Sequence, residues 1–366
     1  MKRIGINFMP YSQDKHGGAE VFLSNVADTL AKREDVQIVK IISGKKAQSE
    51  KIISIPTLKT RVGRVISEQL LLPMVVRKLK LDVLLSNYVV PVFAPCENIA
   101  IIHDMIYRKY PRTLEKKKLI YWRAFIPLTI LVSRSIITVS EFSKKEIVSA
   151  FPLALKKTYV CVEGVKPSMV LAQGKFSKRI INEKYVLCVA TFGKHKNIIN
   201  LVDAFSRLNS GLSKIQLVLV GAARTPDARE YRLKIKLLIQ LKNLNSKVVF
   251  LDHVSDFDLA NLYHNAECLV LPSLYEGFGL PIIEAQYNNC PVICSSEASL
   301  PEIAGNSALY FNPKSADSIK NALENILFDS HLRAQLQSLG WDNIKQFTWA
   351  KAAEQVLYAI DKSLER

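Results

Sequence analysis

Residues 271–284 have the sequence LPSLYEGFGLPIIE and contain the strongest local signal in the chain. The apolar run Cys268–Leu271 is typical of a buried strand, and Pro281 suits the first turn of a helix. Between them, Gly277 and Gly279 allow a tight turn that exposes consecutive N–H groups at the helix N-terminus. Because the helix dipole favours negative charge there, the stretch predicts a strand–loop–helix unit that binds a phosphate or several sugar hydroxyls.

Two acidic residues flank this loop. Glu276 precedes it, and Glu284 lies eight residues later, a turn into the expected helix. One carboxylate can therefore accept hydrogen bonds from a sugar while the other accepts them from a ribose diol. An ordinary strand–turn–helix with two surface glutamates would have the same pattern, so the residues alone leave both interpretations open.

Outward from this loop, strand-like apolar runs alternate with amphipathic helical runs, which predicts an α/β protein with parallel sheets. The expected strands are residues 3–8, 37–42, 83–86, 99–103, 135–139, 158–162, 185–190, 216–220, 247–251, 268–271 and 292–294. The expected helices are residues 19–33, 197–208, 229–241, 256–265, 281–288 and 315–327.

The alternation of strand-like and helical runs is interrupted at residues 163–184, where glycine, proline and lysine predict an inter-domain linker. A chain of 366 residues is also too long for one typical core. We therefore expect two Rossmann-like domains with a linker between them and a separate C-terminal segment. The expected boundaries are 1–165, 166–184, 185–345 and 346–366.

Cysteine usage and hydropathy limit the class of protein. The six cysteines lie in apolar runs without the paired spacing of zinc or redox sites, which indicates reduced, structural thiols. The apolar run at the N-terminus is too short for a signal peptide. No stretch has the ~18 uninterrupted apolar residues of a membrane span. These features predict a cytoplasmic protein that is not integral to a membrane.

Positive charge is concentrated in the first half of the chain. Residues 1–165 contain 27 Lys and Arg against 14 Asp and Glu, a net charge of +13, whereas residues 166–366 have a net charge of +4. The basic stretches 59–80 and 108–123 also contain apolar and aromatic residues, as expected of a surface that rests on anionic lipid headgroups. A solvated basic face is the alternative, and nucleic acid is disfavoured because no known binding motif accompanies the charge.

Several further short motifs occur along the chain. Gly17-Gly18-Ala19-Glu20 follows the first strand, His103-Asp104 follows another, and residues 138–144 (TVSEFSK) form a serine-rich turn. Gly193-Lys-His-Lys-Asn197 is a basic turn, and residues 347–349 (FTW) begin the last helix. Together with the E-x7-E pattern of residues 271–284, these motifs resemble those of the retaining GT-B glycosyltransferases of family four in their order and spacing. The resemblance extends over nearly the whole chain.

The resemblance implies two Rossmann-like domains that face each other across a cleft, with a C-terminal helix that crosses back to the first domain. It implies a nucleotide-sugar donor and no metal or other cofactor. Three residues would take part in transfer: His103, Glu276 and Lys196. The donor would be bound by Gly17, Gly18, Thr191, Lys196, Gly277, Phe278, Gly279, Leu280 and Glu284.

Individual residues would have distinct roles. His103 would contribute hydrogen bonding beside the donor sugar, through its side chain or its backbone carbonyl, rather than act as a nucleophile. Many family members have arginine where this chain has Thr191. Neutralisation of the diphosphate would then depend mainly on Lys196, with His195 or Lys194 as further basic groups.

The expected reaction transfers a hexose with retention at the anomeric carbon. Because no carboxylate is a clear nucleophile, we expect a front-face route in which the departing diphosphate takes the acceptor proton. Residues 275–281 (YEGFGLP) resemble the matching segment of mannosyl- and rhamnosyltransferases of bacterial surface-polysaccharide assembly. This resemblance implies mannose from GDP-mannose, with UDP-hexoses and dTDP-rhamnose as alternatives. The acceptor would be a lipid-linked oligosaccharide of O-antigen or capsule synthesis, at the inner face of the cytoplasmic membrane.

Other classes of function remain possible. An epimerase of the same fold would convert the donor without an acceptor, and a non-catalytic scaffold would only bind it. An NAD-linked dehydrogenase is disfavoured because no G-x-G-x-x-G follows the first strand.

One apparent metal motif has a simpler explanation. Asp256-Phe-Asp258 has the D-x-D form that binds divalent ions in some glycosyltransferases, but it follows Ser255 at the start of a helical run. Serine with an acid three residues later is a helix-capping pattern. We therefore predict capping here and no metal site.

Overall fold

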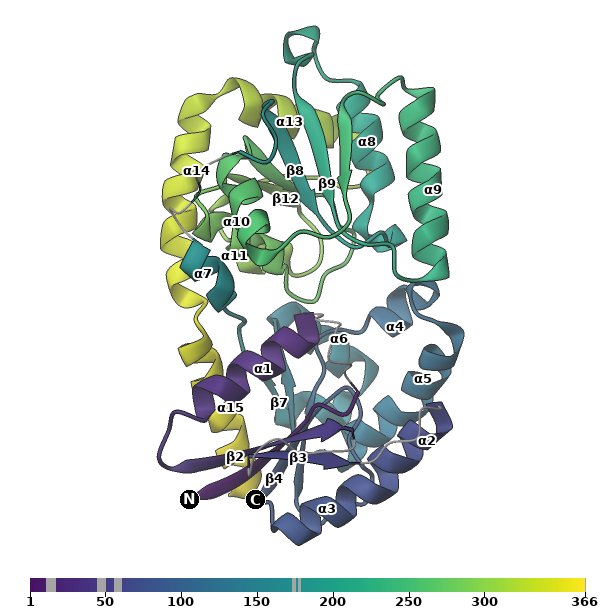
Figure 1. Cartoon of the computed structure of the whole chain (residues 1–366), viewed down its shortest axis with the longest axis vertical. Coiled ribbons are helices and arrows are strands. Elements are labelled where there is room, and N and C mark those ends of the chain that lie inside the picture. Colours follow the sequence, from purple (N-terminus) through teal and green to yellow (C-terminus); the bar gives the residue numbers. More distant parts are fainter. Residues whose placement is uncertain (11–17, 45–50, 56–60, 173–175, 177–178, 366) are drawn as a thin grey trace. The chain divides into compact units, whose positions relative to one another are not determined.

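The computed structural model describes residues 1–10, 18–44, 51–55, 61–172, 176 and 179–365 (Figure 1). Gly17, one of the predicted donor-binding residues, lies outside the described residues. The chain forms two compact units. Unit 1 comprises residues 1–105, 116–164 and 348–366, and unit 2 comprises residues 106–115 and 165–347. The segment 106–115, which we expected in the first domain, therefore groups with unit 2.

Unit 1 is built on a seven-stranded parallel sheet in the order β3-β2-β1-β4-β5-β6-β7. Its strands are β1 (Lys2–Asn7), β2 (Val36–Ser43), β3 (Ile52–Ile55), β4 (Val83–Asn87), β5 (Glu97–Ile101), β6 (Ser135–Thr138) and β7 (Thr158–Val160). The central strand β1 pairs Ile4 with Ile38 of β2 on one side and with Val83 of β4 on the other. Burial on both faces explains why residues 4–6 of β1 and 83–85 of β4 carry no polar side chain.

Helices cover this sheet. They are α1 (Gly18–Leu30), α2 (Arg61–Ile66), a π-helical turn (Ser67–Leu71), α3 (Leu72–Leu79), α5 (Lys116–Val132), α6 (Glu141–Ala150) and α15 (Trp349–Leu364). The expected apolar face of α1 is buried, with Phe22, Val26 and Leu30 fully inaccessible. The C-terminal helix α15 belongs to unit 1, where the Ser135 hydroxyl donates to the Ala359 carbonyl at 3.1 Å. The predicted return of the last helix to the first domain is confirmed.

Unit 2 has a six-stranded parallel sheet in the order β10-β9-β8-β11-β12-β13. Its strands are β8 (Tyr185–Val189), β9 (Gln216–Val220), β10 (Val248–Leu251), β11 (Cys268–Leu271), β12 (Val292–Ser295) and β13 (Ala308–Phe311). Its helices are α4 (Ile106–Lys109), α7 (Pro167–Ala172), α8 (Ile198–Ser206), α9 (Pro226–Leu241), α10 (Asp256–Asn265), α11 (Leu280–Tyr287), α12 (Leu300–Ala304), α13 (Ala316–Phe328) and α14 (Ser330–Asn343). The strand order changes direction between β8 and β11, and such a switch point is where open α/β sheets bind ligands.

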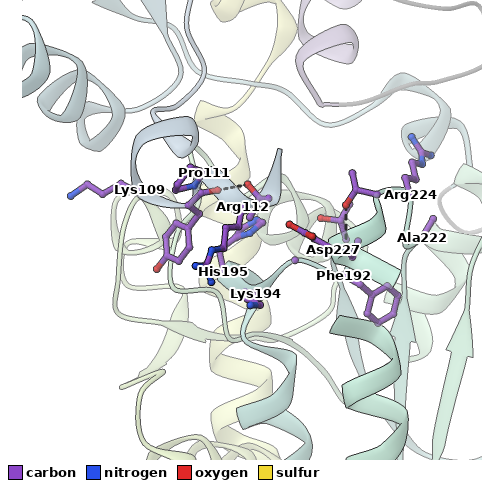
Figure 2. A pocket seen from close by; sticks show the side chains of 15 residues that line it. Lys109, Pro111, Arg112, Phe192, Lys194, His195, Ala222, Arg224 and Asp227 are labelled. Carbon is purple, nitrogen blue, oxygen red and sulfur yellow. Dashed lines mark hydrogen bonds between the residues drawn. The ribbon is translucent and has the colours of Figure 1, made fainter. Parts of the chain in front are cut away.

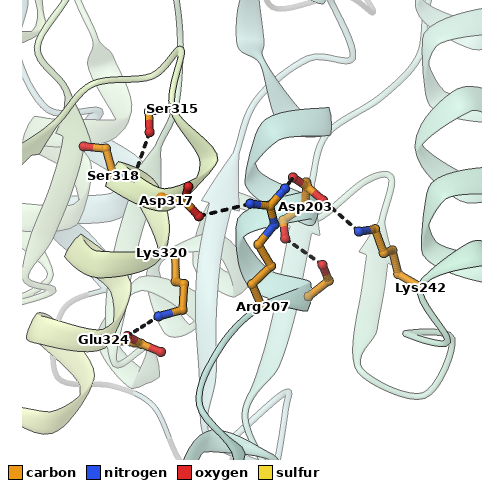
Figure 3. Close-up of polar contacts among 9 residues, drawn as sticks. Asp203, Arg207, Lys242, Ser315, Asp317, Ser318, Lys320 and Glu324 are labelled. Atoms are coloured by element: carbon orange, nitrogen blue, oxygen red, sulfur yellow. Dashed lines mark hydrogen bonds and ion pairs between the residues drawn. The ribbon is translucent and has the colours of Figure 1, made fainter.

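A polar network holds α8 against its neighbours (Figure 3). Arg207 at the end of α8 pairs with Asp203 one turn earlier and with Asp317 of α13 at 3.0 Å. Lys242 after α9 approaches the same Asp203 at 2.9 Å. Exposed pairs of this kind contribute up to about 1 kcal/mol each, so the network mainly orients α8. Helix α8 begins directly after the turn that contains Lys196.

The cysteines agree with expectation, and the apolar helix α5 packs on the core of unit 1. All six cysteines are free, and all but Cys96 are buried. Burial raises the pKa of Cys188 to about 12, which keeps this thiol protonated and unreactive. Helix α5 buries Trp122, Ile126 and Ile130 against the core. Across the described residues, no helix combines the length and the apolarity needed to cross a bilayer.

Candidate functional site

The 271–284 stretch forms the predicted strand–loop–helix unit, with β11 before the loop and α11 after it. Gly279 has a φ of +113°, and a Cβ placed there would lie 2.8 Å from Leu300 Cδ2. The Ser299 hydroxyl is 3.0 Å from the Glu276 carbonyl and donates to the Phe278 carbonyl at 2.7 Å. The loop is therefore held in one shape by a residue that the sequence analysis did not single out.

Lys196 and Glu276, predicted from separate motifs, form an ion pair. Lys196 Nζ lies 2.6 Å from Glu276 Oε1, and their side chains are 15% and 12% exposed. The Ser273 hydroxyl donates to the same carboxylate oxygen at 2.7 Å. This arrangement offers an ammonium to a phosphate and a carboxylate to sugar hydroxyls at adjacent positions.

The turn after β8 brings Lys196 to the loop. Asn197 adopts a left-handed conformation with a φ of +58°, which ends the turn and begins α8. Its side-chain amide donates to the carbonyls of Pro272 (3.1 Å) and Pro313 (2.7 Å). The Leu274 N–H donates to the His195 carbonyl at 2.7 Å. These bonds explain why the basic turn and the E-x7-E loop meet, although the chain separates them widely.

His195 cannot supply the positive charge for which we considered it. Its side chain is buried (7% of the residue is exposed), and burial together with the charge of Lys196 lowers its pKa to about 3. The imidazole is therefore neutral near pH 7. Nδ1 has no hydrogen-bond partner among the described residues. Lys194 in the same turn is exposed and remains a candidate basic group.

Glu284 is buried in α11, and two residues that we did not predict surround its carboxylate. The Tyr263 hydroxyl donates to Oε2 at 3.0 Å, and burial raises the pKa of Tyr263 well above its usual value, so it keeps its proton. Lys166 Nζ lies 3.8 Å from Oε1 and 3.2 Å from Asp256 Oδ1. Burial opposes the charge of Lys166, but these two carboxylates outweigh it and raise the pKa of Lys166. Tyr263 and Lys166 thus orient the carboxylate of Glu284.

The D-x-D sequence caps α10, as predicted. The Ser255 hydroxyl accepts the Asp258 N–H at 3.0 Å and donates to the Asp258 carboxylate at 2.7 Å. Asp256 is paired with Lys166 and accepts a 2.5 Å hydrogen bond from Ser168. In the described part of the chain, both acids are therefore engaged by protein groups.

In unit 1, His103 is buried at the end of β5. The Asn87 amide donates to the Ala19 carbonyl at 3.0 Å, so its oxygen faces His103 Nε2 at 3.1 Å and accepts the Nε2 hydrogen. His103 Nδ1 lies 3.6 Å from Glu163 Oε1. Both ring nitrogens therefore face protein side chains. Gly18, the predicted donor contact next to Ala19, is the first residue of α1.

Known proteins resemble this chain in sequence and in fold. The family described as glycosyl transferases group 1 matches residues 173–340. O-antigen chain mannosyltransferase B of Escherichia coli is 28% identical over 278 residues, which is 71% of this chain and 69% of that protein. O-antigen chain mannosyltransferase RfbU of Salmonella typhimurium is 30% identical over 257 residues, 69% of this chain and 68% of that protein.

A solved structure extends the match to both units. Sucrose-phosphate synthase from Thermosynechococcus elongatus aligns with a TM-score of 0.79 at 20% identity, over 98% of each chain. This likeness confirms the predicted GT-B fold with two Rossmann-like, parallel-sheet domains. The chain belongs to the group 1 glycosyl transferases and is a glycosyltransferase.

Proposed function

We propose that this glycosyltransferase moves mannose from GDP-mannose to an acceptor hydroxyl, with retention of configuration at the anomeric carbon. The observation that carries the proposal is the Lys196–Glu276 pair at 2.6 Å beside the start of α11. Such a pair binds the two parts of a nucleotide sugar that separate in the reaction, the phosphate and the sugar. The choice of mannose is supported by the two O-antigen mannosyltransferases among the relatives.

The donor would lie along the loop between β11 and α11. The oriented carboxylate of Glu284 accepts hydrogen bonds from the ribose diol, and Glu276 accepts them from the sugar. Lys196 and the Thr191 hydroxyl bind the diphosphate together with loop N–H groups at the N-terminus of α11. The loop donors are Gly277, Phe278, Gly279 and Leu280. On the resemblance, Gly17, Gly18 and His103 are the proposed donor contacts of unit 1.

In the transfer step, the bond between the anomeric carbon and the diphosphate oxygen breaks and a bond to the acceptor oxygen forms. The acceptor proton moves to the departing diphosphate. Glu276 is held by Lys196 and Ser273, a position suited to binding sugar hydroxyls rather than to attack on the anomeric carbon. Charge on the leaving group is stabilised by Lys196 and the loop N–H groups, so we propose a reaction that needs no metal.

We expect GDP-mannose to stabilise the protein in a thermal-shift panel of GDP-, UDP- and dTDP-sugars, with or without EDTA. Binding at a ligand concentration of 100 times Kd adds about 2.7 kcal/mol of stability.

Glu284→Ala should weaken donor binding roughly tenfold or more, because a buried carboxylate with two fixed partners is lost. Glu230→Ala, on the exposed face of α9, is the control and should bind like wild type.

Each alternative has its own result in this panel. Preference for UDP-hexose or dTDP-rhamnose would replace the donor, and loss of the shift with EDTA would contradict the metal-free reaction. In a separate assay of the products, conversion of the sugar without an acceptor would indicate an epimerase. No response to any nucleotide sugar would rule out the donor site.

We further propose that unit 1 rests on the inner face of the cytoplasmic membrane, where it meets a lipid-linked oligosaccharide of O-antigen or capsule synthesis. The large apolar side chains exposed on unit 1 include Leu70 (62%), Met74 (67%) and Phe93 (85%). Arg77 and Lys78 are exposed in the last turn of α3. We call these five residues the docking face. Its charge and apolar groups together suit anionic lipid headgroups.

The docking face can be tested with vesicles. We expect the protein to co-sediment with phosphatidylglycerol vesicles and less with phosphatidylcholine vesicles, and to be released by salt. Arg77→Glu/Lys78→Glu should weaken binding at least tenfold, since each basic residue contributes about 1 kcal/mol near an anionic surface. Lys214→Glu/Lys234→Glu in unit 2 makes the same change in charge and should have little effect. Equal loss in both variants would contradict a specific docking face.

A further inference from the structure

Unit 2 contains a second candidate site, a pocket of about 380 Å³ (Figure 2). Its walls are residues 109–113, the turn 191–195 after β8, and residues 222–228, which lead from β9 into α9. We call it the Arg112 pocket. Of the predicted donor-binding residues that the structure describes, only Thr191 lines it, and the loop between Glu276 and Glu284 does not. The pocket therefore adjoins the diphosphate end of the proposed donor site at Thr191 and extends beyond it.

Aromatic contacts place the Arg112 pocket beside the Lys196–Glu276 pair. The Tyr110 ring centroid lies 5.8 Å from those of His195 and Tyr275. These two residues immediately precede Lys196 and Glu276 in the sequence. The pocket thus adjoins the end of the donor site expected to bind sugar and phosphate, whereas Glu284 and Lys166 mark the ribose end. A molecule bound in the pocket would lie next to the sugar that is transferred.

The pocket has an excess of positive charge. It is lined by one acidic residue, Asp227, and by four basic residues, Lys109, Arg112, Lys194 and Arg224. Figure 2 shows Arg112 and Asp227 in the middle of the view and Lys109 and Arg224 toward its sides. Within the described residues, neither Arg112 nor Arg224 has an ion pair with a protein carboxylate. An anion would balance this charge, and the planar guanidinium groups suit a phosphate.

A buried polar group also lines the pocket. The His195 imidazole is neutral, and its Nδ1 has no hydrogen-bond partner among the described residues. A buried polar atom without a partner costs stability, so its retention points to a ligand as its partner. A Cβ on Gly193 would lie 2.7 Å from this atom, so only glycine leaves room for the ring.

We propose that the Arg112 pocket is the acceptor subsite and binds a phosphate group of the acceptor. The inference rests on the proposed transfer reaction and adds the chemical class of the second substrate. Arg112 and Arg224 bind the phosphate oxygens, and the neutral imidazole of His195 donates a hydrogen bond to the phosphate. The Asp227 carboxylate accepts a hydrogen bond from a saccharide hydroxyl. The same phosphate chemistry occurs in a free sugar phosphate and in a lipid diphosphate.

The test uses inorganic pyrophosphate, titrated calorimetrically into the full chain that has been saturated with GDP. GDP occupies the donor site, so remaining heat reports a second anion site. We expect Arg112→Gln and Arg224→Gln each to weaken pyrophosphate binding about tenfold and to leave GDP affinity unchanged. Arg179→Gln, an exposed arginine of unit 2 outside the pocket, should bind both ligands like wild type.

Two results would overturn the subsite. One is complete displacement of pyrophosphate by GDP, and the other is wild-type pyrophosphate binding by both pocket variants. Failure of GDP and UDP to bind, with pyrophosphate binding still sensitive to Arg112 and Arg224, would remove the donor proposal but keep the anion site. Tighter binding of a short prenyl diphosphate than of mannose 1-phosphate would identify a lipid-linked acceptor, and the reverse a free sugar phosphate.

Discussion

Replacement of Lys196 with methionine is expected to lower kcat/KM roughly 100-fold or more. The ammonium lies 2.6 Å from Glu276 and is the basic group best placed to stabilise the departing diphosphate. Removal of one such preorganised group costs about 100- to 1,000-fold in other enzymes. The measurement is initial rate with the donor found in the nucleotide-sugar panel, together with thermal unfolding to show that unit 2 remains folded.

Two variants separate chemistry from folding. Lys196→Met also leaves the poorly exposed Glu276 carboxylate without its cation, so Lys196→Met/Glu276→Gln should regain stability but not activity. Lys320→Met breaks a comparable pair with Glu324 on α13 (Figure 3) and should keep wild-type activity. If Lys196→Met retained more than half of its activity, the role in leaving-group stabilisation would be wrong.

Gly221→Ala is expected to have the largest effect on stability. Gly221 directly follows β9 with a φ of +150°, and an added Cβ would lie 2.0 Å from the Ala190 carbonyl oxygen, a backbone atom that cannot rotate away. We expect a loss of at least about 3 kcal/mol from strain and steric overlap. In a unit of this size that lowers Tm by about 10 °C, measurable by calorimetry.

Gly305→Ala is the matched control. Gly305 also has a positive φ, +54°, but a Cβ there would have nothing within 4 Å. Its φ and ψ of +54° and −126° lie in a region that alanine rarely adopts, so the variant should show the conformational cost alone, about 1–3 kcal/mol, and lose less stability than Gly221→Ala. Equal losses of stability in the two variants would mean that the close approach of Gly221 to Ala190 does not contribute to the destabilisation.

Much of the fold could be predicted because its signals are local. Strands β9 and β11 and helix α10 have the predicted bounds, since a short apolar run or a serine cap with acids in the first turn specifies each of them. Two strands were missed, β3 (Ile52–Ile55) and β13 (Ala308–Phe311). Both are short edge strands that are partly exposed, and their pairing depends on β2 and β12 rather than on their own pattern.

The packing of residues 106–115 against unit 2 could not be predicted from the sequence either. Their position in the chain favoured the first domain, yet they group with unit 2, where Tyr110 contacts His195 and Tyr275. Aromatic contacts between residues far apart in the chain leave no periodic pattern. The Arg112 pocket depends on this segment and could not be predicted.

By itself the sequence determined the α/β class, the capped D-x-D turn and the glycine loop that begins α11, because each depends on neighbouring residues. It also identified Lys196, Glu276 and Glu284 as separate candidates. Only the tertiary structure decided that Lys196 and Glu276 form an ion pair, that Tyr263 and Lys166 orient Glu284, and that His195 is neutral. Hydrogen bonds, ion pairs and pKa values depend on distance and burial, which the folded chain sets.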